Sequence, residues 1–504
     1  MTSSRTHMTK LNAKVSTLNR IVTLLCNFIC RSVFIQTLGS EYLGVGGMFG
    51  NVFSIISLCE LGFGEAASQA MYKPLAQGNS AEIHGILRYY TKVYRYISLI
   101  TVTLSMAFMP FLPYAFPDIV KISNYRAVYL LFVIHQMLTF CFAPKRSLVM
   151  SDQRMYVIMT SRTITVLLVS AAQILCLLYT GNYLLYIFLR IFFLAVDGAA
   201  VEAYANKKYK LTNEKRFVLS GKTKSNINNN TKLLFIHRIG GVINNSTDSI
   251  LLSSCLGLSH MGIFSNYSLI INSLGSFISL AVNAATASVG NLGTDENAAK
   301  SEQILTRLCF ANFYMMTNCT ALLLCLINPA ISLWIGKEMC FSMAETAVII
   351  ACFYMSYIRD PVQIFLRSYG VFKSTRYISL IRGLLNLFIS YMLVKSYGVA
   401  GVFAGTLIST VAVPFVSEPY MLFKHGFGTD FKNFMRKYLG YILSSLMICS
   451  ICLIATATLG IDSGSIVSIF TKGILVLVFT NILLIVFYGR TDEFKSLLKI
   501  VLKK

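Results

Sequence analysis

Apolar stretches long enough to cross a bilayer recur along the whole chain. A membrane-spanning helix needs about 20 consecutive, mostly apolar residues, and about fourteen such stretches can be placed here. The 504-residue chain is 55% hydrophobic and 13% charged, whereas soluble domains carry about 25% charged residues. Because the connections are short, no sizeable soluble domain fits. We therefore predict an all-α integral membrane protein. Its spans begin near Asn19, Leu43, Arg95, Val128, Met155, Tyr183, Leu233, Gly262, Leu308, Met343, Tyr377, Val399, Tyr438 and Gly464.

The formal net charge of +23 comes from 44 lysines and arginines that are distributed very unevenly. With loops assigned alternately to the two sides, only four fall opposite the N-terminus and four lie within spans; the rest share the N-terminal side. The positive-inside rule then places both termini in the cytoplasm. The excess charge reflects topology and favours anionic membrane lipids as partners, not nucleic acid. The 13 cysteines show no paired spacing on an outward loop, so no metal site is expected.

The longest polar stretch divides the chain. Residues 206–232 are rich in lysine and asparagine and read as a cytoplasmic linker between an N-terminal lobe, 1–205, and a C-terminal lobe, 233–437. Residues 438–504 would add two helices and a basic tail to this six-plus-six core. A weak repeat supports the division, because Leu38-Gly39, four residues and Gly44 recur as Leu256-Gly257, four residues and Gly262. Transporters built from parallel repeats bind substrate at the repeat interface.

Two charges lie near the middle of matching spans, Arg31 in the first and Asp248 in the seventh. A charge at that depth costs roughly 2.5–3.5 kcal/mol and persists only when it faces a partner or a wet cavity. We therefore expect a charged cavity that carries an anionic cargo. The alternative is that the two residues pair with each other, or with Glu60 or Glu65, and hold the lobes together.

Other intramembrane polar groups leave both structural and functional interpretations open. Arg190, Glu202 and Glu418 lie near helix ends, where snorkelling or structural pairing is common. Arg359-Asp360 precedes Pro361, so a structural ion pair competes with a site there. The run from Asn244 to Asp248 is polar on every helix face and could coordinate a proton or Na⁺, although ordinary helix-to-helix hydrogen bonds also explain it. Asp197 and Lys472 complete the set of charges within spans.

No pattern points to catalysis or to ATP. Ser220-Gly221-Lys222-Thr223 resembles the end of a phosphate-binding loop, but position 216 is Arg216 where that motif requires glycine. We find no nucleophile–base pair, and no outward loop large enough for a membrane polymerase. The chain is therefore not expected to be an enzyme, and no bound cofactor is expected beyond a coupling H⁺ or Na⁺.

Three blocks of motifs resemble the Wzx-type polysaccharide flippases of the multidrug/oligosaccharidyl-lipid/polysaccharide exporter superfamily. The first block runs from Arg31 to Ala76 and the second from Thr247 to Leu292, including Asn266-Tyr267 and the segment 288–292. The third contains Asn328-Pro329, Leu333–Lys337, Asn386-Leu387, Tyr397–Gly401 and Glu418–Tyr420. The blocks follow one another over nearly the whole chain, which is more specific than any single motif. Glu65 departs from the small residue common in relatives.

The resemblance implies a V-shaped, MATE-like pair of six-helix lobes with two extra C-terminal helices in a bacterial cytoplasmic membrane. The implied cargo is an undecaprenyl-pyrophosphate-linked oligosaccharide, flipped to the outer leaflet by alternating access for lipopolysaccharide O-antigen, capsule or exopolysaccharide. Polysaccharide polymerase and glycosyltransferases are the implied partners. Arg31 would contact the pyrophosphate and Lys472 would help receive the lipid. The candidate substrate-binding set is Arg31, Arg190, Arg359, Lys472, Asn51 and Asn266; the ion-coupling set is Asp248, Glu60, Glu65, Asp197 and Glu418.

Two other functions remain as alternatives. An ion-coupled multidrug or small-molecule exporter of the same superfamily would favour carboxylates over Arg31 in its cavity, and would not need the extra pair of spans. A membrane glycosyltransferase or polymerase would need a large outward loop or a metal-binding acidic motif, and neither is visible.

Overall fold

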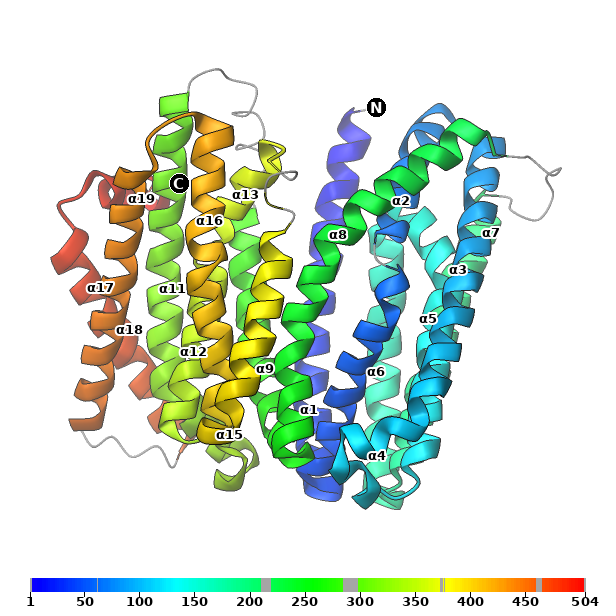
Figure 1. Ribbon diagram of the computed structural model, residues 1–504, viewed down its shortest axis with the longest axis horizontal. Coiled ribbons are helices and arrows are strands. Elements are labelled where there is room, and N and C mark those ends of the chain that lie inside the picture. The colour runs from blue at the N-terminus through cyan, green and yellow to red at the C-terminus, as the bar shows by residue number, and fades with distance from the viewer. Residues whose placement is uncertain are drawn as a thin grey trace. The chain divides into compact units, whose positions relative to one another are not determined.

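The computed structural model describes residues 2–60, 62–209, 219–283, 298–371, 375, 377–458 and 465–502. These residues form helices and short helical turns, with no strand among them (Figure 1). The predicted all-α class is confirmed. Segment 288–292 of the second family block lies outside the described residues.

Contacts divide the chain into a first unit, Met1–Gly262, and a second unit, Ile263–Lys504. The helices that begin in the first unit are α1 (Thr2–Ile56), α2 (Phe63–Gln77), α3 (Ser80–Phe108), α4 (Leu112–Ala115), α5 (Tyr125–Ser151), α6 (Met155–Thr180), α7 (Tyr183–Tyr209), α8 (Gly221–Leu251) and α9 (Leu258–Asn283). Short turns η1 (Ser57–Glu60), η2 (Met109–Phe111), η3 (Pro117–Lys121) and η4 (Leu252–Leu256) connect them.

The second unit contains most of α9 and the remaining helices. These are α11 (Ala298–Ile335), α12 (Met343–Tyr357), α13 (Asp360–Ser368), α15 (Ile378–Ala412), α16 (Pro414–Leu422), α17 (Phe431–Thr458), α18 (Ile466–Tyr488) and α19 (Asp492–Leu502). The turns η5 (Lys337–Met339) and η6 (Phe423–Phe427) lie between them.

Ten helical segments of the described chain are long and apolar enough to cross a membrane, as a multi-pass membrane protein requires. Two of them each contain two predicted spans, because α1 breaks at Gly39 (φ 81°, ψ −179°) and α15 breaks at Gly398 (φ 55°, ψ −132°). The spans predicted from Leu233 and Gly262 fall in α8 and α9, which are not among the ten. The count of fourteen therefore stays a prediction.

The helix α8 packs with the first unit, against α1 and α2 (Figure 1). The proposed linker 206–232 is helical at both ends, since α7 continues to Tyr209 and α8 begins at Gly221; residues 210–218 lie outside the described part. In the second unit, α17 and α18, the predicted additional pair, both pack on α11. Asn481 donates to Asn318 across the α18–α11 contact at 2.9 Å.

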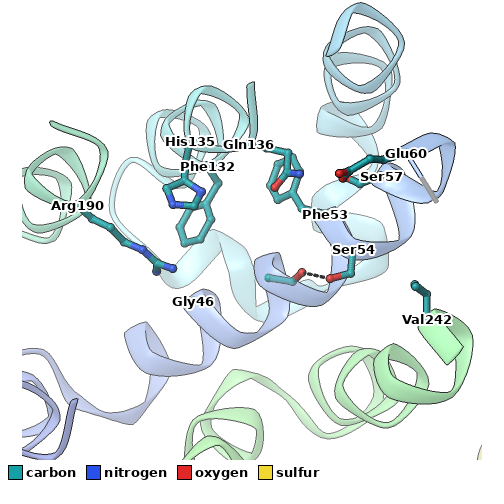
Figure 2. Close-up of a pocket in the computed structure, with 11 residues that line it drawn as sticks. Gly46, Phe53, Ser54, Ser57, Glu60, Phe132, His135, Gln136, Arg190 and Val242 are labelled. Carbon is teal, nitrogen blue, oxygen red and sulfur yellow. Dashed lines mark hydrogen bonds between the residues drawn. The ribbon is translucent and has the colours of Figure 1, made fainter. Parts of the chain in front are cut away.

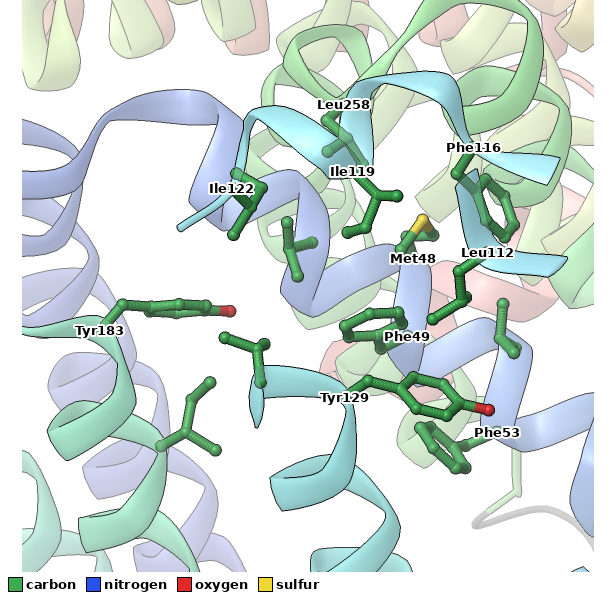
Figure 3. Close-up of a cluster of buried hydrophobic side chains, with 14 of the residues drawn as sticks. Met48, Phe49, Phe53, Leu112, Phe116, Ile119, Ile122, Tyr129, Tyr183 and Leu258 are labelled. Atoms are coloured by element: carbon green, nitrogen blue, oxygen red, sulfur yellow. The ribbon is translucent and has the colours of Figure 1, made fainter. Parts of the chain in front are cut away.

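The core of the first unit is aromatic and lies around the second half of α1. Phe49 is fully buried and meets Tyr129 edge-on at 5.2 Å between ring centroids (Figure 3). The Tyr129 hydroxyl donates to the Ser105 carbonyl at 2.9 Å, which ties α5 to α3. Apolar burial alone does not hold membrane helices together, because lipid is equally apolar, so such close packing and interhelical hydrogen bonds position α1.

The weak sequence repeat is a local structural repeat. Gly39 and Gly257 both have positive φ, at 81° and 98°, and each precedes a helical segment. A methyl group added at Gly44 would overlap the carbonyl oxygen of Leu258, and one added at Gly262 would overlap that of Ser40. The two segments therefore cross with equivalent contacts, and small residues permit this approach of two backbones. Where the segments meet, the hydroxyls of Ser40 and Ser259 lie 3.2 Å apart.

A carboxylate secures the beginning of α9 within the first unit. Asp118 of η3 accepts from the Leu258 backbone N–H at 3.3 Å and pairs with Lys121 at 2.7 Å. A methyl group at Gly257 would overlap this carboxylate. The anion thus satisfies one of the free N–H groups at a helix N-terminus.

We expect Asp118→Asn to lower the thermal unfolding midpoint at pH 7, and we expect this effect to disappear once the pH falls below the folded-state pKa of Asp118. The hydrogen bond from Lys121 lowers the pKa of Asp118 from its ordinary 3.8. The stabilisation is therefore complete above that value and is lost as pH falls through the lower folded-state pKa. An exposed pair contributes under ~1 kcal/mol, so the shift is small. Thermal unfolding of both proteins from pH 7 to pH 2 measures it, and a difference as large at pH 2 as at pH 7 would contradict the assignment.

Candidate functional site

The first unit contains a cavity of about 310 Å³ between α1, η1, α5, α7 and α8 (Figure 2). Its lining residues are Gly46, Gly50, Phe53, Ser54, Ser57, Glu60, Phe132, His135, Gln136, Arg190 and Val242. This volume is about twice that of an engineered cavity that holds one benzene molecule, so it suits a compact polar group.

One face of α1 leaves room for the cavity because it carries small residues. Gly46, Gly50 and Ser54 follow one another at four-residue intervals, which places them on the same side of the helix, and Ser57 follows as the first residue of η1. The Ser54 hydroxyl donates to the Gly50 carbonyl at 2.9 Å. The wall from α1 is therefore narrow, hydroxyl-bearing and uncharged.

A cationic group lines one side of the cavity. The side chains of Arg190 on α7 and His135 on α5 lie next to each other in Figure 2 and interact electrostatically. Arg190 also interacts with the hydroxyl of Tyr186, four residues earlier on α7, which in turn interacts with Arg31 on α1. Arg31 is half-buried and is not itself a lining residue.

A carboxylate lies on the opposite side. Glu60 ends η1 and accepts a hydrogen bond from Tyr94 at 2.7 Å. Tyr94 accepts from Tyr90 at 3.3 Å, and the Tyr90 hydroxyl lies 3.0 Å from that of Ser147. Both tyrosines are buried, so a row of hydroxyls leads from the cavity into the protein. The cavity therefore has a cationic side and an acidic side.

Most other predicted residues of the first unit have structural partners. Asn51 donates to the Gly47 carbonyl of its own helix at 2.9 Å. Asp197 pairs with Arg146 and accepts from Ser161 at 2.6 Å. Glu65 is exposed in the first turn of α2.

The polar run 244–248 lies on α8. Asn244 and Thr247 bond carbonyls of their own helix at 2.6 Å each, while Asp248 is half-buried. Glu202, for which both interpretations were open, pairs with Lys145. These two hydrogen bonds lie within α8.

In the second unit, two predicted site residues pair with each other. Arg359 and Glu418 are both buried, with Nε and Oε2 3.2 Å apart. Asp360 accepts a hydrogen bond from the Ser279 hydroxyl at 3.0 Å, so the carboxylate that pairs with Arg359 is that of Glu418 and not that of Asp360. The pairing of Arg359 with Glu418 favours a structural ion pair over a substrate site in the segment before Pro361. Asn266 is fully buried on α9, and Lys472 is half-buried on α18 near Cys325.

Several residues of the site had not been singled out from the sequence, among them His135, Gln136 and Tyr94, which have polar side chains. His135 and Gln136 are a histidine and a glutamine inside an apolar stretch, and an ionisable residue within a span is a functional candidate by default. That signal was available for His135. Tyr94 gave none, because its role depends on Glu60 of a different element.

Comparisons with known proteins agree with this fold. The family described as "Polysaccharide biosynthesis protein" matches residues 10–287. The search of curated proteins found no match. Among solved structures, the chain is similar to the lipid II flippase MurJ in an inward closed conformation, with a TM-score of 0.66 and 14% identity over 95% of this chain and 99% of the other.

A multidrug resistance MATE family transporter of the MOP superfamily, in its inward-facing conformation, has a TM-score of 0.59 and 12% identity. The match covers 80% of this chain and 94% of that transporter. A Vibrio cholerae MATE transporter has a TM-score of 0.56 and 14% identity, over 83% and 98%. At such identities the likeness concerns the fold, and the predicted MATE-like architecture is confirmed. Because the family match covers more than half of the chain, this protein belongs to the polysaccharide biosynthesis protein family.

Proposed function

We propose that the protein is a flippase that moves an undecaprenyl-pyrophosphate-linked oligosaccharide from the cytoplasmic to the outer leaflet by alternating access. The observation that carries the proposal is the cationic side of the cavity, where Arg190 and His135 face a space with no competing carboxylate beside them among the described lining residues. A guanidinium binds phosphate oxygens bidentately, which suits a pyrophosphate. The family and the similarity to a lipid II flippase support a lipid-linked cargo.

The proposal assigns distinct parts of the cargo to distinct walls. The pyrophosphate lies against Arg190, and Arg31, which interacts with Tyr186, adds positive charge from outside the lining. The first sugars meet the wall formed by α1 and η1, where Ser54 and Ser57 offer hydroxyls. We leave Arg359 out of the ligand set, because it is buried against Glu418. Asn266 is left out as well, because it is fully buried on α9, and Lys472 keeps its proposed role in receiving the lipid.

The same proposal includes the orientation of the protein in the membrane and the proteins that supply and receive its cargo. Both termini face the cytoplasm of a bacterial inner membrane, as the lysine and arginine distribution favours. A protease-sensitive tag at the C-terminus, cleaved in inverted vesicles and protected in intact cells, tests this. The cargo would come from glycosyltransferases and pass to a polymerase; O-antigen, capsule and exopolysaccharide units all fit this chemistry.

Transport needs a bias between two conformations, and we assign it to cargo binding and to protonation or Na⁺ binding at a carboxylate. Glu60 is the first candidate because it lines the cavity and is bonded to Tyr94. Asp248 on α8 is the second. Asp197 and Glu418 are each paired with an arginine, which leaves them less suited to bind a cation.

The deciding experiment is reconstitution into vesicles with a fluorescent undecaprenyl-pyrophosphate oligosaccharide. We expect flipping without ATP, accelerated by an imposed proton or sodium gradient. An organic cation such as ethidium tests the alternative of an ion-coupled drug exporter, which the cavity carboxylate Glu60 favours. Transport of ethidium with no movement of the lipid would replace the flippase proposal.

We expect Glu60→Gln to remove most or all of the dependence of the flipping rate on the proton or sodium gradient, while the cargo still binds. Glutamine keeps the size and accepts from Tyr94 but cannot carry the charge that binds a proton or Na⁺. Glu65→Gln, at an exposed position on α2, is the matched control and should behave as wild type. Initial flipping rates with and without each gradient measure the effect. Unchanged dependence in the Glu60 variant would move the assignment to Asp248.

A further inference from the structure

We propose that His135 binds the cargo's phosphate together with Arg190, and that it takes up one proton from solvent when the anion binds. This inference rests on the proposed function and deepens it. It makes His135 a specificity-determining residue, which turns anion binding into a pH-dependent event in the cavity.

The geometry begins with His135 and Arg190 as neighbours in the cavity lining. His135 lies on α5, half-buried, one turn after Phe132, which also lines the cavity. Arg190 reaches the same space from α7, and the two side chains are near neighbours in Figure 2. A single phosphate group placed in the cavity can therefore contact both.

The remaining surroundings of His135 are nearly free of charge. The wall from α1 contributes glycine and serine, and α8 contributes Val242. Glu60 on η1 is the titratable group on the far side of the cavity, where it is bonded to Tyr94. Arg190 is the charged group that acts on the imidazole. The protonation of His135 therefore responds chiefly to Arg190 and to whatever anion lies between the two.

The charge balance gives the direction of the response. In the empty cavity, the permanent charge of Arg190 and partial burial both favour the neutral imidazole. A bound phosphate reverses this, because its negative charge stabilises a second cation and its oxygens accept the N–H of an imidazolium. The proton comes from solvent to a ring nitrogen, and no covalent bond changes. Neutral ligands induce no such uptake, so the pair selects anions.

Calorimetry of the full chain in lipid nanodiscs tests this, with farnesyl diphosphate as the probe. Titrations in two buffers of different ionisation enthalpy give the number of protons taken up. We expect the wild type to take up more protons than His135→Gln near pH 7.5, with a difference of up to one. The ligand's own ionisation is the same for both proteins and cancels. Relative to His135→Gln, wild-type affinity should fall about tenfold between pH 6 and pH 8, because proton uptake on binding links the affinity to pH.

Two further variants make the test specific. His135→Arg carries a permanent charge and should bind at pH 8 as tightly as the wild type does at pH 6, without the additional proton. His260→Gln is the matched control, because His260 is exposed at the start of α9, where its ring bonds the Leu256 carbonyl at 2.8 Å. It should match the wild type in affinity and proton uptake.

The outcomes separate this inference from the function on which it rests. Binding with equal proton uptake in wild type and His135→Gln would overturn the role of His135 and leave the flippase proposal intact. Failure of the wild type to bind farnesyl diphosphate at all would overturn both. If His135→Gln does not fold, the comparison of wild type with His135→Arg decides, since equal proton uptake by these two proteins also overturns the inference.

Discussion

Arg190→Ala is expected to abolish glycan export and to weaken binding of a lipid diphosphate at least about tenfold, because a hydrogen bond between charged groups contributes about 1.5–3 kcal/mol. Arg190 lines the cavity and carries a permanent charge that no other residue of the described lining supplies. Arg190→Lys should restore binding only partly, since an ammonium cannot form the bidentate contact of a guanidinium. Probe titration of purified protein and surface glycan in a strain that lacks the endogenous protein measure the two effects.

Arg162→Ala is the matched control for Arg190, because Arg162 is an exposed arginine on α6 that does not line the cavity. It should leave export and binding unchanged. Arg31→Ala is expected to reduce export with normal membrane insertion, through its interaction with Tyr186 rather than by direct contact. Full export by the Arg190→Ala protein, at wild-type expression, would remove the cationic side of the cavity from the proposal.

Gly44→Ala is expected to destabilise the protein severely, by about 3 kcal/mol or more, since an overpacked contact in a rigid core costs about 1–3 kcal/mol and occasionally more. The added methyl group would overlap the Leu258 carbonyl oxygen, which is backbone and cannot rotate away. Relief requires that the start of α9 move away from α1, and the Ser40–Ser259 contact would be lost with it. The midpoint of thermal unfolding in detergent and the yield of monodisperse protein measure the effect.

Gly440→Ala provides the comparison, because Gly440 is inside α17 and a methyl group there would meet open space. That substitution should be neutral or stabilise by up to about 1 kcal/mol, since alanine is the better helix former. Gly262→Ala should behave as Gly44→Ala does, because its methyl group would overlap the equivalent carbonyl of Ser40. Equal midpoints for the Gly44 and Gly440 variants would show that the crossing is not tightly packed.

The residues that the repeat singled out illustrate what a pattern can and cannot predict. The equivalence of Gly39 and Gly257 followed from the spacing of glycines along the sequence, and the positive φ of both residues confirms a shared local conformation. That Gly44 and Gly262 lie against each other's segment did not follow, because spacing along one chain contains no information about which segments cross. The contact needed both backbones in place.

The buried charges show the same limit. Arg31 and Asp248 lie at similar depths in their predicted spans, yet both fall in the first unit. Arg31 interacts with Tyr186 and does not line the cavity. Arg359 precedes Asp360 in the chain but pairs with Glu418, a residue of another helix. Side-chain partners are chosen by distance in space, and helix rotation and tilt determine that distance.

The sequence by itself determined that this chain is a multi-pass helical membrane protein of the polysaccharide biosynthesis family. The physical reason is that every span in a bilayer must satisfy its own backbone hydrogen bonds. Each span is therefore a long apolar helix that can be recognised from local composition. Only the tertiary structure decided which polar groups share a cavity, since His135, Arg190 and Glu60 come from three separate elements. Their meeting depends on which helix faces pack together, and that is a property of the assembled unit.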